Sequence, residues 1–281
     1  MRRSRSRNLR LLAAWALSLT FLGLPHPSLV APGVAANFRD LLPDLRMVAP
    51  REIRLQVATT EEGPDRRLLR FTAIIINRGE GPFVVRAKRD CATSACPTMT
   101  TRQRIKRSDG SWRAIDSTAT AEQDVGDGHR HWHVLNVERY ELYQLDPPAT
   151  EPTPIRGVKV GFCFFDGVAW NLSLKGAPSR PVYLESGCGT TSSTSLKMGL
   201  SVGWGDVYPW SISRQWIDTT GLPAGRYLLC STANASGEWL EMHTTNNDSW
   251  ADVELYQDSD GVDSVRVITK GRSSCAGQLP S

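Results

Sequence analysis

Beyond its N-terminal segment, the sequence never sustains the 3.6-residue period of an amphipathic helix, and this constrains the fold most strongly. Short runs rich in β-branched and aromatic residues recur instead between clusters of glycine, proline and asparagine, which is typical of strands and turns. The clearest runs are residues 67–76, 83–85, 250–257 and 263–270. The pattern predicts an all-β protein, an antiparallel β-sandwich with long loops and little helix.

Two connections in this pattern can be interpreted further. Asn77, Gly79 and Gly81 separate two apolar runs, which predicts a hairpin between them. Residues 175–205 are rich in glycine, serine and threonine and show no helical period, so we expect one long loop or a pair of loops there. Loops of that length in a compact domain are usually functional or disordered.

The N-terminus has the features of a secretory signal peptide. The first ten residues carry five arginines, and an uncharged, mostly apolar run follows at residues 11–24. That run is shorter than the roughly 20 residues of a membrane-spanning helix, the alternative reading. The small residues 34–36 fit a cleavage site. We therefore expect a signal peptide at residues 1–36, one domain at residues 37–281, secretion to the extracellular space, and no stable membrane insertion after cleavage.

Loss of the signal peptide would also change the charge balance. The 33 basic side chains fall to 28, against 29 acidic ones, so the mature chain is close to neutral. No run of basic residues with interleaved aromatics appears. The sequence therefore predicts no nucleic-acid partner.

Six cysteines behind a signal peptide indicate disulfides rather than catalytic thiols. No CxxC motif is present, which disfavours a thiolate metal site. Six cysteines allow fifteen connectivities, and the sequence alone does not choose among them. Cys91 and Cys96 close a short loop, and our interpretation pairs Cys163 with Cys188 and Cys230 with Cys275.

Three of the five histidines stand at alternate positions, as His129, His131 and His133. Alternate residues of an extended strand point to one face, so the three imidazoles can converge on one metal ion. Imidazole suits copper, zinc, nickel and iron, and the triad alone does not identify the ion. The alternative is a cluster of histidines on a solvated strand that binds no metal.

The run GHRHWH, followed by an aromatic-rich strand, resembles the copper-binding segment of the lysyl oxidase family. Two further runs extend the resemblance. KVGFC places Lys159 at the family's cofactor lysine, and WGDVY, located by counting back from QWID at residues 215–218, places Tyr208 at its cofactor tyrosine. Cysteines of the family's vertebrate members are replaced here by Gly128, Trp204 and Arg214.

The resemblance implies copper held by the histidines and a lysine tyrosylquinone cofactor formed from Lys159 and Tyr208. A protein has no native electron sink for an amine, so such a cofactor would carry the difficult step. Lysine adds to an oxidised tyrosine ring only as the neutral amine. Asp206 is our candidate for the base that removes a proton from the substrate. In isolation, a solvated lysine, a packed tyrosine and a turn-forming aspartate would each be ordinary.

A second metal site is implied by two more segments. PDL at residues 43–45 and EMHTTNN at residues 241–247 are similar to calcium-binding segments of some family members. The candidate calcium ligands are oxygen donors of the hard kind that this ion prefers, from Asp44, Leu45, Glu241, Asn246 and Asn247. His243 stands where an aspartate is expected, and the alternative is that the two asparagines only cap a turn.

The resemblance implies an enzyme: a copper-dependent amine oxidase that uses dioxygen to convert primary amines, including those of lysine-bearing proteins, to aldehydes, with release of hydrogen peroxide and ammonia. One alternative is a non-catalytic, secreted metal-binding or adhesion module. Another is a zinc hydrolase, which the absence of an HExxH motif disfavours.

Overall fold

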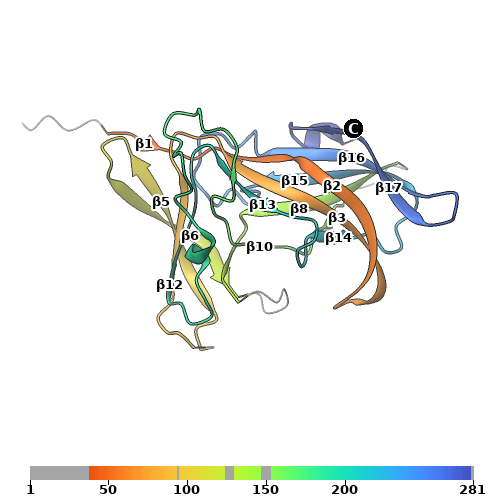
Figure 1. Ribbon diagram of the computed structural model, residues 1–281, viewed down its shortest axis with the longest axis horizontal. Helices are drawn as coiled ribbons and strands as arrows, with labels where there is room; N and C mark the ends of the chain where they lie inside the picture. The colour runs from red at the N-terminus through yellow and green to blue at the C-terminus, as the bar shows by residue number, and fades with distance from the viewer. Residues whose placement is uncertain (1–37, 94, 124–129, 147–152, 280–281) are drawn as a thin grey trace, which may run out of the picture. The chain divides into compact units, whose positions relative to one another are not determined.

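The computed structural model describes residues 38–93, 95–123, 130–146 and 153–279. These residues form strands joined by loops, in three sheets whose neighbouring strands all run antiparallel (Figure 1). The chain from Phe38 onward forms one compact unit. The predicted signal peptide lies outside the described residues and stays a prediction.

The first sheet has seven strands. Its order is β10 (Gly161–Phe162), β7 (His133–Leu135), β6 (Trp112–Glu122), β5 (Thr98–Arg107), β4 (Phe83–Lys88) and β12 (Ser195–Leu200), with β1 (Asp40–Leu41) beside β5. The strand β12 therefore forms one edge, and the short strands β7 and β10 lie at the other.

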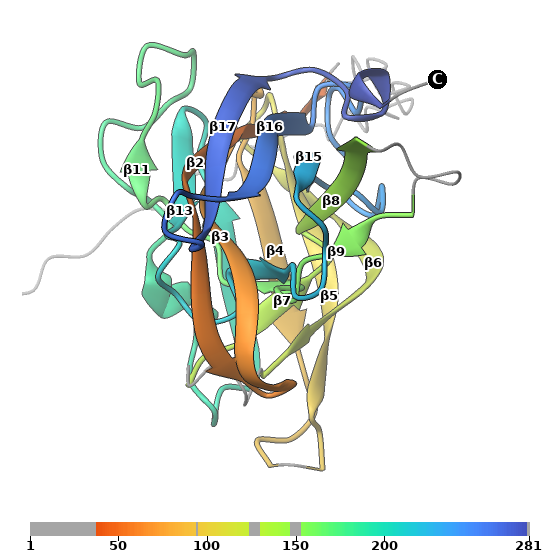
Figure 2. The same cartoon turned by 90° about the vertical axis from the view of Figure 1, so that its right-hand side faces the viewer.

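The second and third sheets have five strands each. The second has the order β11 (Val168–Ala169), β13 (Trp204–Tyr208), β3 (Gly63–Asn77) and β14 (Trp216–Asp218), with β2 (Leu45–Thr60) paired to β3. The third has the order β17 (Asp263–Gly271), β16 (Asp248–Gln257), β15 (Gly225–Ala233), β8 (Glu138–Asp146) and β9 (Ile155–Arg156). Figure 2 shows β17, β16, β15 and β8 in this order, and the long pair β2 and β3.

The all-β prediction is confirmed. In the part of the chain that the structure describes, the only helical segments are two short 3₁₀ helices, η1 (Glu185–Cys188) and η2 (Ala276–Gln278). None of the described residues belongs to a helix long and apolar enough to cross a bilayer.

One hydrophobic core draws on strands of all three sheets. Phe71 of β3, Val85 of β4, Tyr140 of β8 and Leu229 of β15 all belong to it and are almost fully buried. The rings of Phe71 and Tyr140 meet edge to face at 5.0 Å. Each large apolar side chain buried in this way stabilises the fold by about 1.5–3 kcal/mol. The core faces of the strands are therefore fixed, and with them the direction of the alternate side chains.

The predicted hairpin at Asn77, Gly79 and Gly81 is wrong, because β3 and β4 belong to different sheets. The segment between them packs against the connection from β1 to β2, where the Glu80 and Gly81 N–H groups both donate to the carbonyl of Leu42. A Cβ atom on either glycine would collide with that backbone. The glycines therefore serve a close approach between distant segments and not a tight turn.

The interpretation of residues 175–205 as loop is only partly right. This range contains η1, the whole of β12 and the start of β13. In β12 the buried Leu196 and Met198 alternate with the exposed Ser195 and Lys197. The alternation is short and follows many small polar residues, so the local sequence does not indicate a strand.

All three predicted disulfides are confirmed, as Cys91–Cys96, Cys163–Cys188 and Cys230–Cys275. The bridge from Cys163 to Cys188 matters most for the site described below. It joins the residue directly after β10 to the last residue of η1.

Candidate active site

A small cavity of about 110 Å³ collects residues that are far apart in the sequence. Five residues predicted from the histidine, lysine and tyrosine runs line it: His131, His133, Lys159, Asp206 and Tyr208. The remaining predicted copper ligand, His129, lies outside the described residues. Three separate segments of the chain therefore meet in one place.

The strand pairing of the first sheet brings two of these segments together. Gly161 of β10 pairs with Leu135 of β7, and Phe162 pairs with Val134. A Cβ atom on Gly161 would lie 2.7 Å from the Cβ atom of His133, which is closer than side chains tolerate. A glycine at this position therefore lets Lys159, just before β10, lie beside the histidines.

The third segment arrives through the second sheet. Strand β13 pairs with β3, with Asp206 opposite Ile75 and Tyr208 opposite Ala73. Asp206 and Tyr208 are alternate residues of this strand, so both point to the same side. Both line the cavity and both are buried.

The two described histidines converge. Their Nε2 atoms lie 3.1 Å apart and their ring centroids 4.7 Å apart. Trp132 between them is buried elsewhere, with its Nε1 donating to the carbonyl of Thr190 at 2.9 Å. The alternate positions therefore place these two imidazoles side by side, although the strand β7 begins only at His133.

This histidine pair fits a metal such as copper. Nitrogen ligands at about 2.0–2.1 Å from one ion lie roughly 3 Å from each other, which is the separation observed here. Imidazole nitrogen is also a donor that copper accepts well. Within the described residues, no group of three or more histidine, cysteine, aspartate or glutamate side chains could hold a metal ion. Completion of a three-histidine site depends on His129.

The predicted cofactor residues are neighbours. The Nζ atom of Lys159 lies 5.5 Å from the centre of the Tyr208 ring and 5.4 Å from that of Phe162. Phe162 meets Tyr208 edge to face at 5.2 Å. The Tyr208 hydroxyl donates to the carbonyl of Cys163 at 3.2 Å. The tyrosine ring is therefore held between an aromatic neighbour and the disulfide-bonded residue after β10.

Burial is the main cause of the shifted pKa values of Asp206 and Tyr208. It raises the pKa of Asp206 to about 7, although hydrogen bonds to the carboxylate and, less strongly, the charge of Lys159 oppose the rise. Burial first, and then the charge of Asp206, raises the pKa of Tyr208 well above its usual value. Without metal, the phenol is therefore protonated at neutral pH, whereas Asp206 exchanges its proton near neutrality.

Two carboxylates near Lys159 were not predicted: Glu185, which lines the cavity, and Glu138, which lines a neighbouring cavity together with Lys159. Glu138, at the start of β8, is buried and accepts a hydrogen bond from the Tyr140 hydroxyl at 2.6 Å. Burial, helped by the charge of Asp206, raises its pKa to about 8, although the hydrogen bond from Tyr140 and the charge of Lys159 oppose the rise. The available signal was a carboxylate two residues before the aromatic Tyr140, on the same face of a strand that faces the core.

The structure also brings together all the candidate calcium ligands. Asp44 accepts hydrogen bonds from Asn246 at 3.0 Å and from the Arg46 guanidinium at 2.7 Å, and His243 Nδ1 lies 3.3 Å from its carboxylate. Glu241 accepts hydrogen bonds from Asn247 at 2.8 Å and from the Leu45 N–H at 2.9 Å.

This cluster keeps oxygen atoms that a cation could use, but it already contains a positive charge. The side-chain oxygens of Asn246 and Asn247 are buried and have no hydrogen-bond partner among the described residues. Arg46, which sequence reasoning missed, forms an ion pair with the buried Asp44. Arg46 therefore competes with any calcium ion for that carboxylate.

Comparison with known proteins gives a family for this chain. The sequence model of one family, described as lysyl oxidase, matches residues 117–264, which is more than half of the chain. The chain is 28% identical over 192 residues to lysyl oxidase homolog 2B of Danio rerio, covering 68% of this chain and 19% of that protein. It is 32% identical over 119 residues to lysyl oxidase homolog 1 of Homo sapiens, covering 42% of this chain and 18% of that protein.

The chain spans less than a fifth of the length of these curated relatives. The matched family region runs from β6 to β17 and includes every residue that lines the small cavity. On the extent of this match, the chain belongs to the lysyl oxidase family.

Proposed function

We propose that this chain is a secreted, copper-dependent amine oxidase whose quinone cofactor is built from Lys159 and Tyr208. The observation that carries the proposal is the shared cavity: two convergent imidazoles, the lysine and the tyrosine line the same space. Family membership supports an oxidase-like enzyme but leaves the activity of this chain to be measured.

Copper bound by His129, His131 and His133 would supply the redox chemistry by which dioxygen oxidises the Tyr208 ring. The fold contributes by holding the lysine amine near the tyrosine ring. Lys159 Nζ lies 5.5 Å from the centre of the Tyr208 ring, so a movement of the lysine side chain within the cavity would bring the amine to a ring carbon. A carboxylate that accepts the lysine's proton would leave the neutral amine that this addition needs.

In turnover, a primary amine, dioxygen and water would yield an aldehyde, ammonia and hydrogen peroxide. A base must remove a proton from the carbon that bears the amine. Asp206 lines the cavity, and its pKa of about 7 suits a general base at neutral pH. A cavity of about 110 Å³ has room for an aliphatic amine chain, which supports a lysine side chain or a small primary amine as substrate.

The proposal is tested by peroxide release from the copper-loaded protein with a small primary amine. We expect Lys159→Arg and Tyr208→Phe each to abolish release while the circular dichroism spectrum stays unchanged, because each removes one half of the cofactor. Lys106→Arg and Tyr143→Phe are matched controls outside the cavity and should stay active. Peroxide release at the unaltered rate from either cofactor variant would refute the quinone, and a non-catalytic metal-binding module would then explain the fold better.

A further inference from the structure

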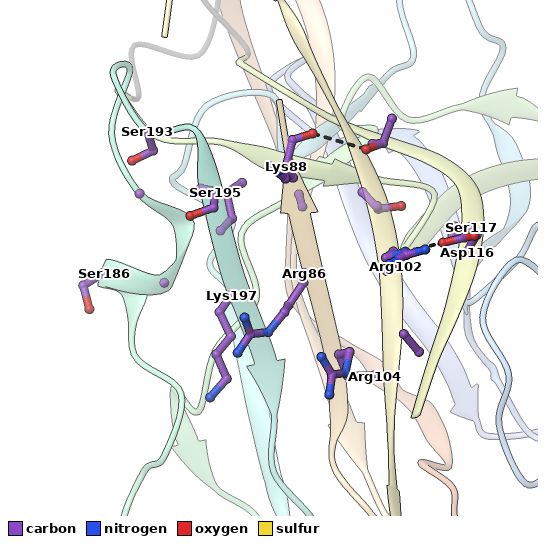
Figure 3. Close-up of a pocket in the computed structure, with 17 residues that line it drawn as sticks. Arg86, Lys88, Arg102, Arg104, Asp116, Ser117, Ser186, Ser193, Ser195 and Lys197 are labelled. Carbon is purple, nitrogen blue, oxygen red and sulfur yellow. Dashed lines mark hydrogen bonds and ion pairs between the residues drawn. The ribbon is translucent and has the colours of Figure 1, made fainter. Parts of the chain in front are cut away.

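A much larger groove, of about 900 Å³, lies on the first sheet and shares no lining residue with the small cavity. Strands β12, β4, β5 and β6 contribute to it (Figure 3). Five basic side chains and one carboxylate line it: Arg86, Lys88, Arg102, Arg104, Lys197 and Asp116. The near-neutral mature chain therefore concentrates positive charge at this place.

The strand register sets like charges side by side. Lys197 of β12 pairs with Arg86 of β4, and Arg86 pairs with Arg102 of β5. Their sequence neighbours Val85, Ala87, Leu196 and Met198 are buried in the core, so the basic side chains are committed to the opposite face. Like charges directly opposite each other in a sheet destabilise it. The fold therefore carries an electrostatic cost at this face.

The cost is only partly offset within the chain. Arg102 forms an ion pair with Asp116 on β6. Among the residues that the structure describes, Arg86, Lys88, Arg104 and Lys197 form no ion pair with a carboxylate, and the buried Nε atom of Arg104 has no hydrogen-bond partner. Figure 3 shows Arg86 and Lys197 extending next to each other. An anionic partner would relieve this repulsion.

The spacing of the cations indicates the form of the partner. Arg86 and Lys88 are alternate residues of one strand, as are Arg102 and Arg104 of the next, so within each pair the side chains repeat at about 7 Å. An extended polypeptide repeats its alternate side chains at the same distance. Guanidinium groups also bind carboxylates through paired hydrogen bonds. We propose that the groove binds an acidic polypeptide segment in extended conformation, with carboxylates at alternate residues.

One element connects this groove with the candidate active site. Ser186 and Gly187 of η1 line the groove, and Glu185 of the same helix lines the small cavity. Binding of an acidic segment stands independently of any catalysis. If the proposed function holds, a lysine that follows such a segment in a protein substrate is held close to the cavity.

The test is fluorescence anisotropy with the full mature chain and a labelled eleven-residue peptide of alternating glutamate and threonine. We expect saturable binding that weakens as salt is added, because surface charges are screened. Arg86→Gln together with Lys197→Gln should weaken binding at least tenfold. Arg180→Gln together with Lys270→Gln removes two exposed charges outside the groove and should leave affinity unchanged.

Several results would overturn the proposal. One is absence of peptide binding. Another is that the groove variant, Arg86→Gln with Lys197→Gln, binds the peptide as tightly as the unaltered chain does. A third is that the unaltered chain binds a peptide with the same glutamates in one block as tightly as the alternating peptide. Tighter binding of a sulfated oligosaccharide or of single-stranded DNA through the same arginines would assign the groove to another class of partner. Lys159→Arg should leave peptide binding intact, and the groove variant should still oxidise a small amine, so failure here and failure of the proposed function are distinguishable.

Discussion

Gly161 shows how a single residue shapes the candidate site. Its missing side chain lets β10 approach His133, and the lysine two residues earlier then shares a cavity with the histidines. The same cavity contains Asp206, whose burial places its pKa near neutrality. The position of Lys159 beside the candidate metal ligands thus depends on one close contact between two short strands, whereas Asp206 and Tyr208 arrive on β13.

Copper binding is a prediction at this scale. Replacing His131 with alanine removes one of two imidazole nitrogens that lie 3.1 Å apart, so we expect most of the bound copper to be lost on metal analysis. The control is His243→Ala, because His243 lies beside Asp44, away from the cavity. Full copper retention by the His131 variant would show that other residues bind the ion.

The raised pKa of Glu138 predicts how the stability of the fold depends on pH. Its pKa of about 8 in the fold lies above the ordinary value of 4.5, so the metal-free folded protein keeps a proton that the unfolded chain releases. Its contribution to stability is therefore complete below about pH 4.5 and is lost as pH rises towards 8, at up to about 1.4 kcal/mol per pH unit.

Denaturant titrations of the metal-free protein across this range test that contribution. Glu138→Gln should flatten the decline in the free energy of unfolding and make the variant relatively more stable at pH 8. Glu254→Gln, at a partly exposed glutamate that forms an ion pair with Arg266, is the control and should follow the unaltered protein. Parallel pH profiles for Glu138→Gln and the unaltered chain would count against the assigned pKa.

At the scale of elements, the sequence was informative about strands and poor about their partners. Alternation of apolar and polar residues identified the all-β class. Glycines between two strands, however, are expected both in a tight turn and where the chain crosses from one sheet to another, so those before β4 do not distinguish the two. Gly79 and Gly81 are glycines because the backbone around Leu42 presses on them, and Leu42 is distant in sequence. Such tertiary contacts leave no local pattern.

The residues in and around the two candidate sites differ in the same way: some belong to a local sequence pattern and others depend on tertiary contacts. Lys159 and Tyr208 could be found because each belongs to a recognisable short motif. Glu138 and Arg46 could not, because their roles depend on which strand or loop packs against them. Glu138 acquires its shifted pKa only when β8 is buried, and Arg46 meets its partner at the start of β2.

The junction between β2 and the loop before β16 yields a prediction about calcium. Arg46 supplies the positive charge beside Asp44, so we expect Arg46→Ala to bind calcium at least tenfold more tightly than the unaltered chain. Isothermal titration with calcium measures this directly, and Arg54→Ala serves as the control because its guanidinium lies over the Trp210 ring instead. Equal affinities would mean that Arg46 and calcium do not compete.

At the scale of the whole molecule, the net charge does not indicate where the charged side chains lie. The sequence indicated a near-neutral mature chain, yet the fold places cations from β4, β5 and β12 in one groove. These strands are adjacent only because the sheet orders them so, and a linear sequence does not reveal strand order. The fold contains three disulfides, which persist in oxidising compartments, and the signal peptide stays a prediction.

The central claim is that the chain builds its own quinone, and peptide mass spectrometry after copper loading in air tests it most directly. We predict that the peptides containing Lys159 and Tyr208 appear as one cross-linked, carbonyl-reactive species, which Tyr208→Phe fails to form. Separate and unmodified peptides from a protein shown to contain copper would contradict the account.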